Sequence, residues 1–307
     1  MAQIVVFDEY GPPEVLRLVE VTDPVPAEDQ LRIRVRAAGV QPFDAAYRSG
    51  AFAQHRPALF PAQLGNEAAG VVDATGPSVM TFAVGDEVIG FLDSTGYADT
   101  IVLPAANAVG KPGTMPWAEA GVLSASGQTA DTALDLLGVT AGDWLLVHAA
   151  AGGVGSFAVQ LAAVRGARVI GTASPGNHAY LAGLGAVPVA YGPGLEDRVR
   201  ALAPDGITAA LDCVGGEANE VSARLLGSAA RAVTLVDWDA EHRLDVRRVG
   251  TERSAARLLS LTRLYESGRL VVPLRRTFAL ADANLAHHEI ETGHGRGKIA
   301  LTVDDPS

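Results

Sequence analysis

The chain has 307 residues, a net charge of −11 and 48% hydrophobic residues, with one cysteine, Cys213. The length suits two domains, and the negative charge argues against nucleic acid or an anionic membrane surface as a partner. One cysteine excludes an internal disulfide and a zinc site made of several cysteines. The N-terminal residues lack a basic region followed by a long apolar stretch, so we expect a first strand and a cytoplasmic protein.

The first 118 residues are expected to be rich in strands. Residues 31–36 alternate apolar and basic side chains, as in a half-exposed strand. Short apolar segments at 69–72, 87–91 and 100–104 are also typical of strands. We therefore predict a β-rich catalytic domain over 1–118.

From residue 119 onward, strands alternate with helices. Strands are predicted at 168–173, 187–190, 206–214 and 231–236, and helices at 179–184, 219–226 and 251–267. This alternation indicates right-handed crossovers and a parallel sheet covered on both faces. We predict a dinucleotide-binding domain over 119–267. A return to the first domain follows over 268–307, with strand-like segments at 270–272 and 298–303.

The run from 144 to 162 is an apolar strand, a glycine turn and a helix. Its pattern Ala150-x-Gly152-x-x-Gly155 is the dinucleotide fingerprint with alanine in place of the first glycine. Gly152 would let a pyrophosphate approach the backbone, and Gly155 would let the helix pack closely on the strand. The helix N-terminus would then offer free N–H groups to the phosphates. The residues predicted to contact the dinucleotide here are Ala150, Gly152, Gly153, Val154 and Gly155.

Short segments in a characteristic order cover nearly the whole chain. They are AGVQPFD (38–44), RSG (48–50), GNEAAGVV (65–72), GDEV (85–88), HAAAGGVG (148–155), GTAS (171–174), DCVGG (212–216) and GKI (297–299). Together they resemble the medium-chain dehydrogenase/reductase superfamily, specifically its zinc-independent quinone oxidoreductase branch. The resemblance implies an α/β fold in which a doubly wound parallel sheet (Rossmann) is inserted into a partly open β-barrel (GroES-like) catalytic domain.

The zinc dehydrogenases of this superfamily bind a catalytic metal through a Cys and a His in two of these segments. Gln41 and Asn66 stand at those positions here, and amides bind zinc poorly compared with thiolate and imidazole. His287, His288 and His294 have no accompanying carboxylate or thiolate cluster, so we expect ordinary helix and loop residues. The resemblance therefore implies no metal, and substrates that are already electron-poor, such as quinones and α,β-unsaturated carbonyls.

NAD-preferring sites place an acid about twenty residues after the glycines, at the end of the second strand. Ser174 stands there, and no acid occurs from 172 to 181, so nothing would repel a 2′-phosphate. Tyr191 matches a family tyrosine that contacts this phosphate, and the predicted cofactor is NADPH. Lys298 would reach the cofactor, or else be a solvated surface lysine. The remaining residues predicted to contact the cofactor are Gln41, Thr129, Ser174, Asn177, His178, Val214 and Val236.

Tyr47 is the candidate catalytic residue, because it would donate a proton or a hydrogen bond to a substrate carbonyl. The commonest tyrosine of related quinone reductases falls one position earlier, at Ala46, so a packing role for Tyr47 is equally open. Asp44 is expected to hold its loop by accepting backbone N–H bonds. Solvent is the alternative proton source, because hydride addition to a quinone or enone leaves a stabilised anion.

The leading hypothesis is an NADPH-dependent oxidoreductase that transfers a hydride to a quinone or α,β-unsaturated carbonyl without zinc. A reductase of an iminium or enoyl group in a biosynthetic pathway is one alternative. A low-turnover NADPH-binding protein with a structural or interaction role is another. A homodimer is also expected, because relatives pair the last strands of their nucleotide sheets and an open strand edge is a liability. The corresponding region here is 231–236.

Overall fold

The computed structural model describes residues 1–227, 231–293 and 295–303, and the chain divides into two compact units. Unit 1 comprises Met1–Ala125, Arg253–Glu266 and Leu274–Ser307, and unit 2 comprises Ser126–Glu252 and Ser267–Pro273. The chain therefore leaves unit 1, forms most of unit 2 and returns. The helix α9 (Ala255–Glu266) packs beside β8 (Ala108–Gly110) in unit 1, whereas the sequence-based boundaries assign it to the nucleotide domain.

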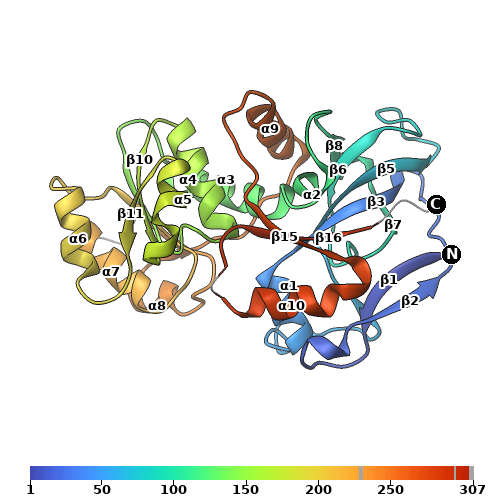
Figure 1. The fold of residues 1–307 in the computed structure, drawn as a ribbon, viewed down its shortest axis with the longest axis horizontal. Helices are drawn as coiled ribbons and strands as arrows, with labels where there is room; N and C mark the ends of the chain where they lie inside the picture. The colour runs from blue at the N-terminus through green and yellow to red at the C-terminus, as the bar shows by residue number, and fades with distance from the viewer. Residues whose placement is uncertain (228–230, 294, 304–307) are drawn as a thin grey trace. The chain divides into compact units, whose positions relative to one another are not determined.

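Unit 2 is organised around a six-stranded parallel sheet (Figure 1). The strands are β9 (Trp144–Val147), β10 (Arg168–Ala173), β11 (Ala186–Ala190), β12 (Ala209–Asp212), β13 (Ala232–Thr234) and β14 (Arg247–Arg248). Their order in the sheet is β11-β10-β9-β12-β13-β14. The order reverses at β9, and in sheets of this kind ligands bind outside the carboxyl ends of the strands at such a point. The predicted doubly wound parallel sheet is confirmed.

Helices connect these strands and cover their apolar side chains. They are α3 (Ser124–Leu137), whose first two residues belong to unit 1, α4 (Gly153–Val164), α5 (His178–Gly183), α6 (Leu195–Leu202), α7 (Glu217–Leu226) and α8 (Ala240–Leu244). Helix α4 packs on β9, β10 and β11, and α7 packs on β12 and β13. Leu146, Ile170 and Val199 belong to the core beneath them. Buried parallel strands require such apolar runs, and for that reason this region could be identified from sequence.

Unit 1 contains a seven-stranded sheet and a three-stranded sheet. The larger sheet runs β15 (Leu274–Ala279), β16 (Lys298–Thr302), β3 (Gln30–Val40), β5 (Glu67–Thr75), β6 (Glu87–Phe91) and β8, with β7 (Thr100–Pro104) also paired to β3. The smaller sheet runs β2 (Arg17–Val21), β1 (Ala2–Phe7) and β4 (Ala62–Gln63). The strand β16 from the end of the chain pairs antiparallel with β3, with Ile299 opposite Val40.

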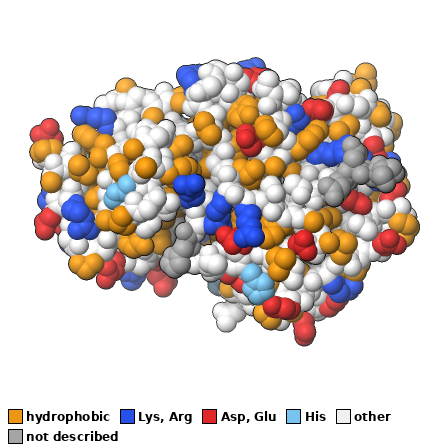
Figure 2. Space-filling view, viewed as in Figure 1, with side chains coloured by type: hydrophobic (Ala, Val, Ile, Leu, Met, Phe, Trp, Pro, Cys, Tyr) orange, Lys and Arg blue, Asp and Glu red, His pale blue; other side chains and the backbone are white. Residues whose placement is uncertain are grey.

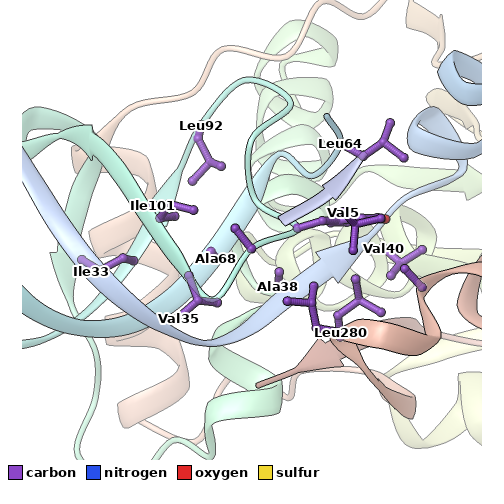
Figure 3. Close-up of a cluster of buried hydrophobic side chains, with 14 of the residues drawn as sticks. Val5, Ile33, Val35, Ala38, Val40, Leu64, Ala68, Leu92, Ile101 and Leu280 are labelled. Atoms are coloured by element: carbon purple, nitrogen blue, oxygen red, sulfur yellow. The ribbon is translucent and has the colours of Figure 1, made fainter. Parts of the chain in front are cut away.

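The strand β3 has the alternation that its sequence predicts. Leu31, Ile33 and Val35 are buried, while Arg32 and Arg34 lie on the other face and pair with Asp73 at 2.8 and 2.9 Å. Figure 3 shows the buried members of β3 gathered with side chains of β1, β5 and residue 280. Four helices belong to this unit: α1 (Pro42–Ser49), α2 (Trp117–Ala120), α9 and α10 (Ala283–Glu291), within the described residues. Short 3-10 turns are η1 (Pro13–Val15), η2 (Ala105–Asn107) and η5 (Leu280–Asp282).

The predicted strand at 270–272 is wrong, because β15 begins at Leu274. The backbone of Val271 is bonded to a side chain instead of a neighbouring strand. Its N–H donates to Gln160 Oε1 at 2.7 Å, and its carbonyl accepts from Gln160 Nε2 at 3.0 Å. Leu270 and Val272 on either side are buried, so this segment packs its apolar side chains without pairing in a sheet.

In Figure 2, acidic and basic side chains are interspersed among apolar ones on the face in view. Across the described part of the chain, none of the helices combines the length and apolar character needed to cross a membrane.

Candidate active site

The glycine turn follows β9 at the reversal of strand order. Ala149 has a φ of 51°, a left-handed conformation that is uncommon for a residue with a Cβ. Its N–H donates to Thr172 Oγ1 at 3.1 Å, and the N–H of Ala150 donates to the Thr172 carbonyl at 3.0 Å. These bonds fix the turn to β10. Sequence analysis did not single out Ala149 or Thr172.

The packing around the turn explains its residue pattern. A Cβ on Gly155 would lie 2.5 Å from the Ala149 carbonyl oxygen, so no side chain fits there. A Cβ on Gly152 would meet only that oxygen within 4 Å, at 3.3 Å, so the space beside it is open. Ala150 is fully buried, and Gly171 of β10 gives its methyl group room. Alanine can therefore replace the first glycine of the fingerprint.

The N-terminus of α4 is not capped by a side chain. Gly152 is the N-cap residue and offers no side-chain oxygen, so the first-turn N–H groups at Gly153, Val154 and Gly155 have no cap partner. Such groups, together with the helix dipole, bind phosphate. The open side of Gly152 and the uncapped first turn therefore fit the pyrophosphate of a dinucleotide.

The end of β10 carries the polar residues predicted for the adenosine ribose. Ser174 follows the strand, and Asn177 Nδ2 donates to its Oγ at 3.3 Å. His178 Nε2 lies 3.3 Å from the Ala173 carbonyl oxygen, so this ring turns back toward the strand end. Tyr191 lies just after β11, the neighbour of β10, and its side chain is 60% exposed.

Arg198 of α6 was not predicted, yet it organises the loop that carries Tyr191. Its guanidinium donates to the carbonyls of Ala190 at 2.9 Å, Gly192 at 3.2 Å and Pro193 at 2.8 Å. A positive charge therefore lies in the loop after β11, although the sequence has no Lys or Arg in the loop after β10. The sequence did not indicate the bonds between Arg198 and this loop, because they form only when α6 folds back onto the end of β11.

Two exposed valines mark the ends of β12 and β13. Val214 and Val236 are 60% and 47% exposed. Beneath them Asp212 is 1% exposed and accepts bonds from the Val214 N–H at 2.8 Å, Asn219 Nδ2 at 2.9 Å and Thr234 Oγ1 at 2.7 Å. The Asp212 carboxylate thus holds both turns at the carboxyl edge of the sheet.

Three further polar or titratable side chains of unit 2 belong to Thr129, His148 and Cys213. Thr129 Oγ1 lies 2.9 Å from Thr251 Oγ1. His148 Nε2 lies 2.9 Å from Ser222 Oγ, and burial lowers the pKa of His148 from 6.5 to about 4. Burial raises the pKa of the Cys213 thiol, which makes it a poor nucleophile.

In unit 1, a buried cluster surrounds the carboxylate of Glu67. Lys298 Nζ lies 3.1 Å from Glu67 Oε1, the Gln41 amide nitrogen donates to the same oxygen, and the Ala125 N–H donates to Oε2 at 2.6 Å. Glu67 is fully buried and Lys298 is 2% exposed. The alternative that Lys298 is a surface lysine is therefore wrong, because its ammonium is buried against a carboxylate. A Cβ on Gly39 would lie 2.1 Å from Glu67 Oε1, so the cluster requires a glycine there.

A second buried network centres on Asp44. Its Oδ2 accepts from the Gln41 N–H at 2.9 Å and from the Tyr97 hydroxyl at 3.1 Å, and its Oδ1 accepts from Asn66 Nδ2 at 3.2 Å. The expectation that Asp44 holds its loop is confirmed. Burial raises the pKa of Asp44 to about 6 despite these donors. The Tyr97 oxygen also lies 3.3 Å from His287 Nε2, and burial lowers the pKa of His287 to about 3.

These donors do not fit zinc. The amide nitrogens of Gln41 and Asn66 donate to carboxylates, and the ammonium of Lys298 already pairs with Glu67. Among the residues that the structure describes, no group of three or more His, Cys, Asp or Glu side chains could hold a metal ion. His294 lies outside the described residues. The absence of zinc stays a prediction, and no chemical step is derived through a metal.

Tyr47 lies in an aromatic cluster. It is 8% exposed, its ring stacks on Phe43 at 6.2 Å and meets Phe7 edge-on at 6.0 Å. The Arg56 guanidinium lies 5.4 Å from the Tyr47 ring centre. This placement favours the packing alternative, and the catalytic role of Tyr47 stays a prediction.

Comparison with known proteins identifies the family. The family profiles described as alcohol dehydrogenase GroES-like domain and zinc-binding dehydrogenase match residues 27–115 and 184–301. The quinone oxidoreductase of Pseudomonas aeruginosa is 31% identical over 98% of this chain and 99% of its own length. The chain belongs to the medium-chain dehydrogenase/reductase superfamily and is quinone oxidoreductase-like. The predicted combination of a GroES-like domain with a Rossmann sheet is thereby confirmed.

Other similar proteins include a much longer synthase and several solved structures of about the same length as this chain. The pikromycin polyketide synthase component PikAII of Streptomyces venezuelae is 34% identical over 89% of this chain, which spans only 8% of that protein. The solved quinone oxidoreductase of Coxiella burnetii has a TM-score of 0.88, 30% identity and 99% coverage of both chains. The CurK enoyl reductase has a TM-score of 0.88 and 25% identity, also covering 99% of both chains. A mycobacterial protein solved in complex with NADPH has a TM-score of 0.86 and 28% identity, covering 98% of this chain and 100% of that one.

Proposed function

We propose that the protein is an NADPH-dependent oxidoreductase that reduces quinones or α,β-unsaturated carbonyls without zinc. The observation that carries the proposal is the turn after β9, where an open Gly152 precedes the uncapped N-terminus of α4. The quinone oxidoreductase of P. aeruginosa, similar over nearly its full length, supports the same reading.

Different residues of unit 2 would bind different parts of the cofactor. The first-turn N–H groups of α4 would bind the pyrophosphate, and Gly155 keeps that helix close to the turn. Ser174 and Tyr191 would bind the 2′-phosphate, since no carboxylate stands at the end of β10. Arg198 fixes the Tyr191 loop and adds a positive charge beside it.

When bound, the nicotinamide supplies a hydride from its C4, and water supplies the proton that completes the reduction of a conjugated acceptor. An electron-poor acceptor needs no Lewis acid, which agrees with a donor set that does not suit zinc. A solvent proton suffices because the anion left by hydride addition is stabilised by conjugation. The buried Tyr47 is then a packing residue, and Asp212 holds the turns that carry Val214 and Val236.

An anaerobic screen of NADPH oxidation against quinones and enones tests this function. With cofactor deuterated at C4, an enone product should carry the label on carbon. Reduction of simple ketones without reduction of any conjugated acceptor would contradict the proposal.

Enoyl reduction is the second candidate, because PikAII and the CurK enoyl reductase are similar to this chain. An enoyl thioester turned over faster than any free quinone or enone would favour it. NADPH binding without turnover of any of these acceptors would instead favour a structural or interaction role.

We also propose a homodimer that forms along the edge of the unit 2 sheet. The predicted edge at 231–236 is wrong, because β13 pairs with both β12 and β14; the edge on this side of the sheet is the two-residue strand β14, which has one side without a neighbouring strand within the described residues. Such an edge invites pairing with another copy. Light scattering at micromolar concentration should give twice the mass of one chain, and a monomer would contradict it.

A further inference from the structure

Tyr180 connects the segment that follows β10 with the first turn of α4. It lies in α5, two residues after His178, and its hydroxyl donates to Ser156 Oγ at 2.9 Å. Tyr180 is half-buried, and Ser156 is fully buried. The helices α4 and α5 lie side by side at this bond (Figure 1). The bond therefore joins the segment proposed for the 2′-phosphate to the helix proposed for the pyrophosphate.

Ser156 extends this connection to the glycine turn. Its Oγ lies 3.3 Å from the Ala150 carbonyl oxygen and 3.2 Å from the Ala151 carbonyl oxygen, so its one proton serves these two acceptors. The bond from Tyr180 uses a lone pair of the same oxygen and leaves that proton for the turn. The peptide planes that lead into Gly152 are thus held by Ser156, and Ser156 is held by Tyr180.

An apolar contact brings the same two segments together. An added Cβ on Gly171 of β10 would lie 2.8 Å from the Ala150 Cβ and 3.2 Å from Leu181 Cδ1. Leu181, the neighbour of Tyr180 in α5, is fully buried. The turn and α5 therefore approach β10 at the same residue, and the hydroxyl of Tyr180 adds a directional bond to this packing.

The distance between the two segments matters because NADPH carries both of its phosphate groups on one ribose. Its pyrophosphate and 2′-phosphate can bind together only if the protein holds the two sites at the matching distance. Asn177 bonds to Ser174 within the same segment, and this bond does not fix that distance. The Tyr180 bond does, because it crosses to the helix that would bind the pyrophosphate.

We propose that Tyr180 is a positioning residue that determines the preference for NADPH by holding the two phosphate sites at the distance that this cofactor requires. This inference rests on the proposed function and adds the residue that makes the two sites act together. NADH has no 2′-phosphate, so its binding should depend on the glycine turn and much less on the distance to the segment after β10.

Tyr180→Phe removes the bond and keeps the ring. NADPH affinity should fall by about 3- to 10-fold, the usual contribution of one hydrogen bond, while NADH affinity should fall by less than about twofold. Tyr265→Phe is the matched control, because Tyr265 is a half-buried tyrosine of unit 1 whose hydroxyl bonds to Glu119. It should change neither affinity. Fluorescence titration measures both cofactors.

Two fragments of the cofactor test whether Tyr180 acts through distance. 2′-AMP carries the 2′-phosphate without the pyrophosphate, and 5′-ADP carries a pyrophosphate without the 2′-phosphate. Tyr180→Phe should leave the affinity for each fragment unchanged while it weakens NADPH, because only the linked ligand requires the fixed distance. In the background of Ser156→Ala, Tyr180→Phe should not lower the ratio of NADPH to NADH affinity further, because the acceptor of the bond is already gone.

The possible results separate this inference from the proposed function. If the wild type does not bind NADPH more tightly than NADH, the cofactor proposal is wrong and this inference falls with it. If the wild type prefers NADPH but Tyr180→Phe lowers both affinities equally, or neither, only the inference about Tyr180 is wrong.

Two further results would also overturn the role of Tyr180. A fall in 2′-AMP affinity equal to the fall for NADPH would show direct contact with the adenosine instead of positioning. A further fall of the affinity ratio in the double variant would show that Tyr180 does not act through Ser156. Partial unfolding cannot imitate the expected result, because it lowers the apparent affinity for both cofactors by the same factor.

Discussion

The polar sites of the two units consist of different chemical groups, backbone N–H groups in unit 2 and buried side chains in unit 1. In unit 2 the candidate phosphate site consists of backbone N–H groups shaped by Gly152, Gly155 and Ala149. In unit 1 the polar centre consists of buried side chains, with Glu67 and Asp44 each surrounded by donors. A site made of backbone depends on which side chains are absent, whereas a site made of side chains depends on pairing. The two units should therefore fail under different substitutions.

The largest effect is expected when the pairing in unit 1 is broken. Lys298→Met leaves Glu67 buried without its countercharge, which should reduce the free energy of unfolding by about 3–5 kcal/mol. Glu67→Gln combined with Lys298→Met should cost less than the sum of the single changes. Denaturant unfolding measures both. Arg17→Met, at the exposed Arg17–Asp8 pair, is the control and should have no measurable effect.

Unit 2 should instead fail when a side chain is added. In Gly155→Val the new Cβ meets the Ala149 carbonyl oxygen at 2.5 Å, so the helix must move away from the turn. Overpacking of this kind costs about 1–3 kcal/mol. If the displaced helix N-terminus loses that free energy in binding the pyrophosphate, NADPH affinity should fall by about 10- to 100-fold. Fluorescence titration measures this loss. Gly183→Ala is the control, since nothing lies within 4 Å of its added Cβ, and equal affinities for the two variants would refute the packing role of Gly155.

A pH series tests the burial of His148 in unit 2. The pKa of His148 is lowered from 6.5 to about 4, so between these values the unfolded chain binds the proton more readily. Stability from the neutral imidazole is therefore present above pH 6.5 and is lost as pH falls toward 4. The advantage of wild type over His148→Gln in unfolding free energy should shrink by about 2 kcal/mol from pH 7 to pH 5. A constant difference across this range would contradict the assignment.

The smallest change concerns which cofactor is preferred. Ser174→Asp places a carboxylate at the end of β10, where it would repel a 2′-phosphate and accept from a ribose hydroxyl. NADPH affinity should fall by about 10-fold, or about 1.4 kcal/mol, and NADH should become the tighter ligand. Ser260→Asp, at an exposed position on α9, adds the same charge and serves as the matched control. Tighter binding of NADH by the wild type would overturn the NADPH proposal.

Sequence reasoning performed best where structure is determined locally. The strands β6, β7 and β10 begin and end at the predicted residues, because apolar segments bounded by turn residues suffice to define them. The glycine turn was likewise predictable from one run of chain. The Glu67–Lys298 pair joins residues 231 positions apart, and Tyr97 meets His287 across 190 positions. No local pattern encodes such contacts, so the surface alternative for Lys298 could not be rejected before the sheet brought β16 beside β3.

The position of β16 has a consequence for the order of synthesis. Residues 37–40 of β3 pair with β16, which emerges from the ribosome only after all the strands of unit 2. The six parallel strands can therefore associate during translation, while the larger sheet of unit 1 still lacks an inner strand and Glu67 still lacks its lysine. A nascent chain of this protein carries an open strand edge through most of its elongation. That edge is a natural place for a chaperone to bind and for premature chains to aggregate.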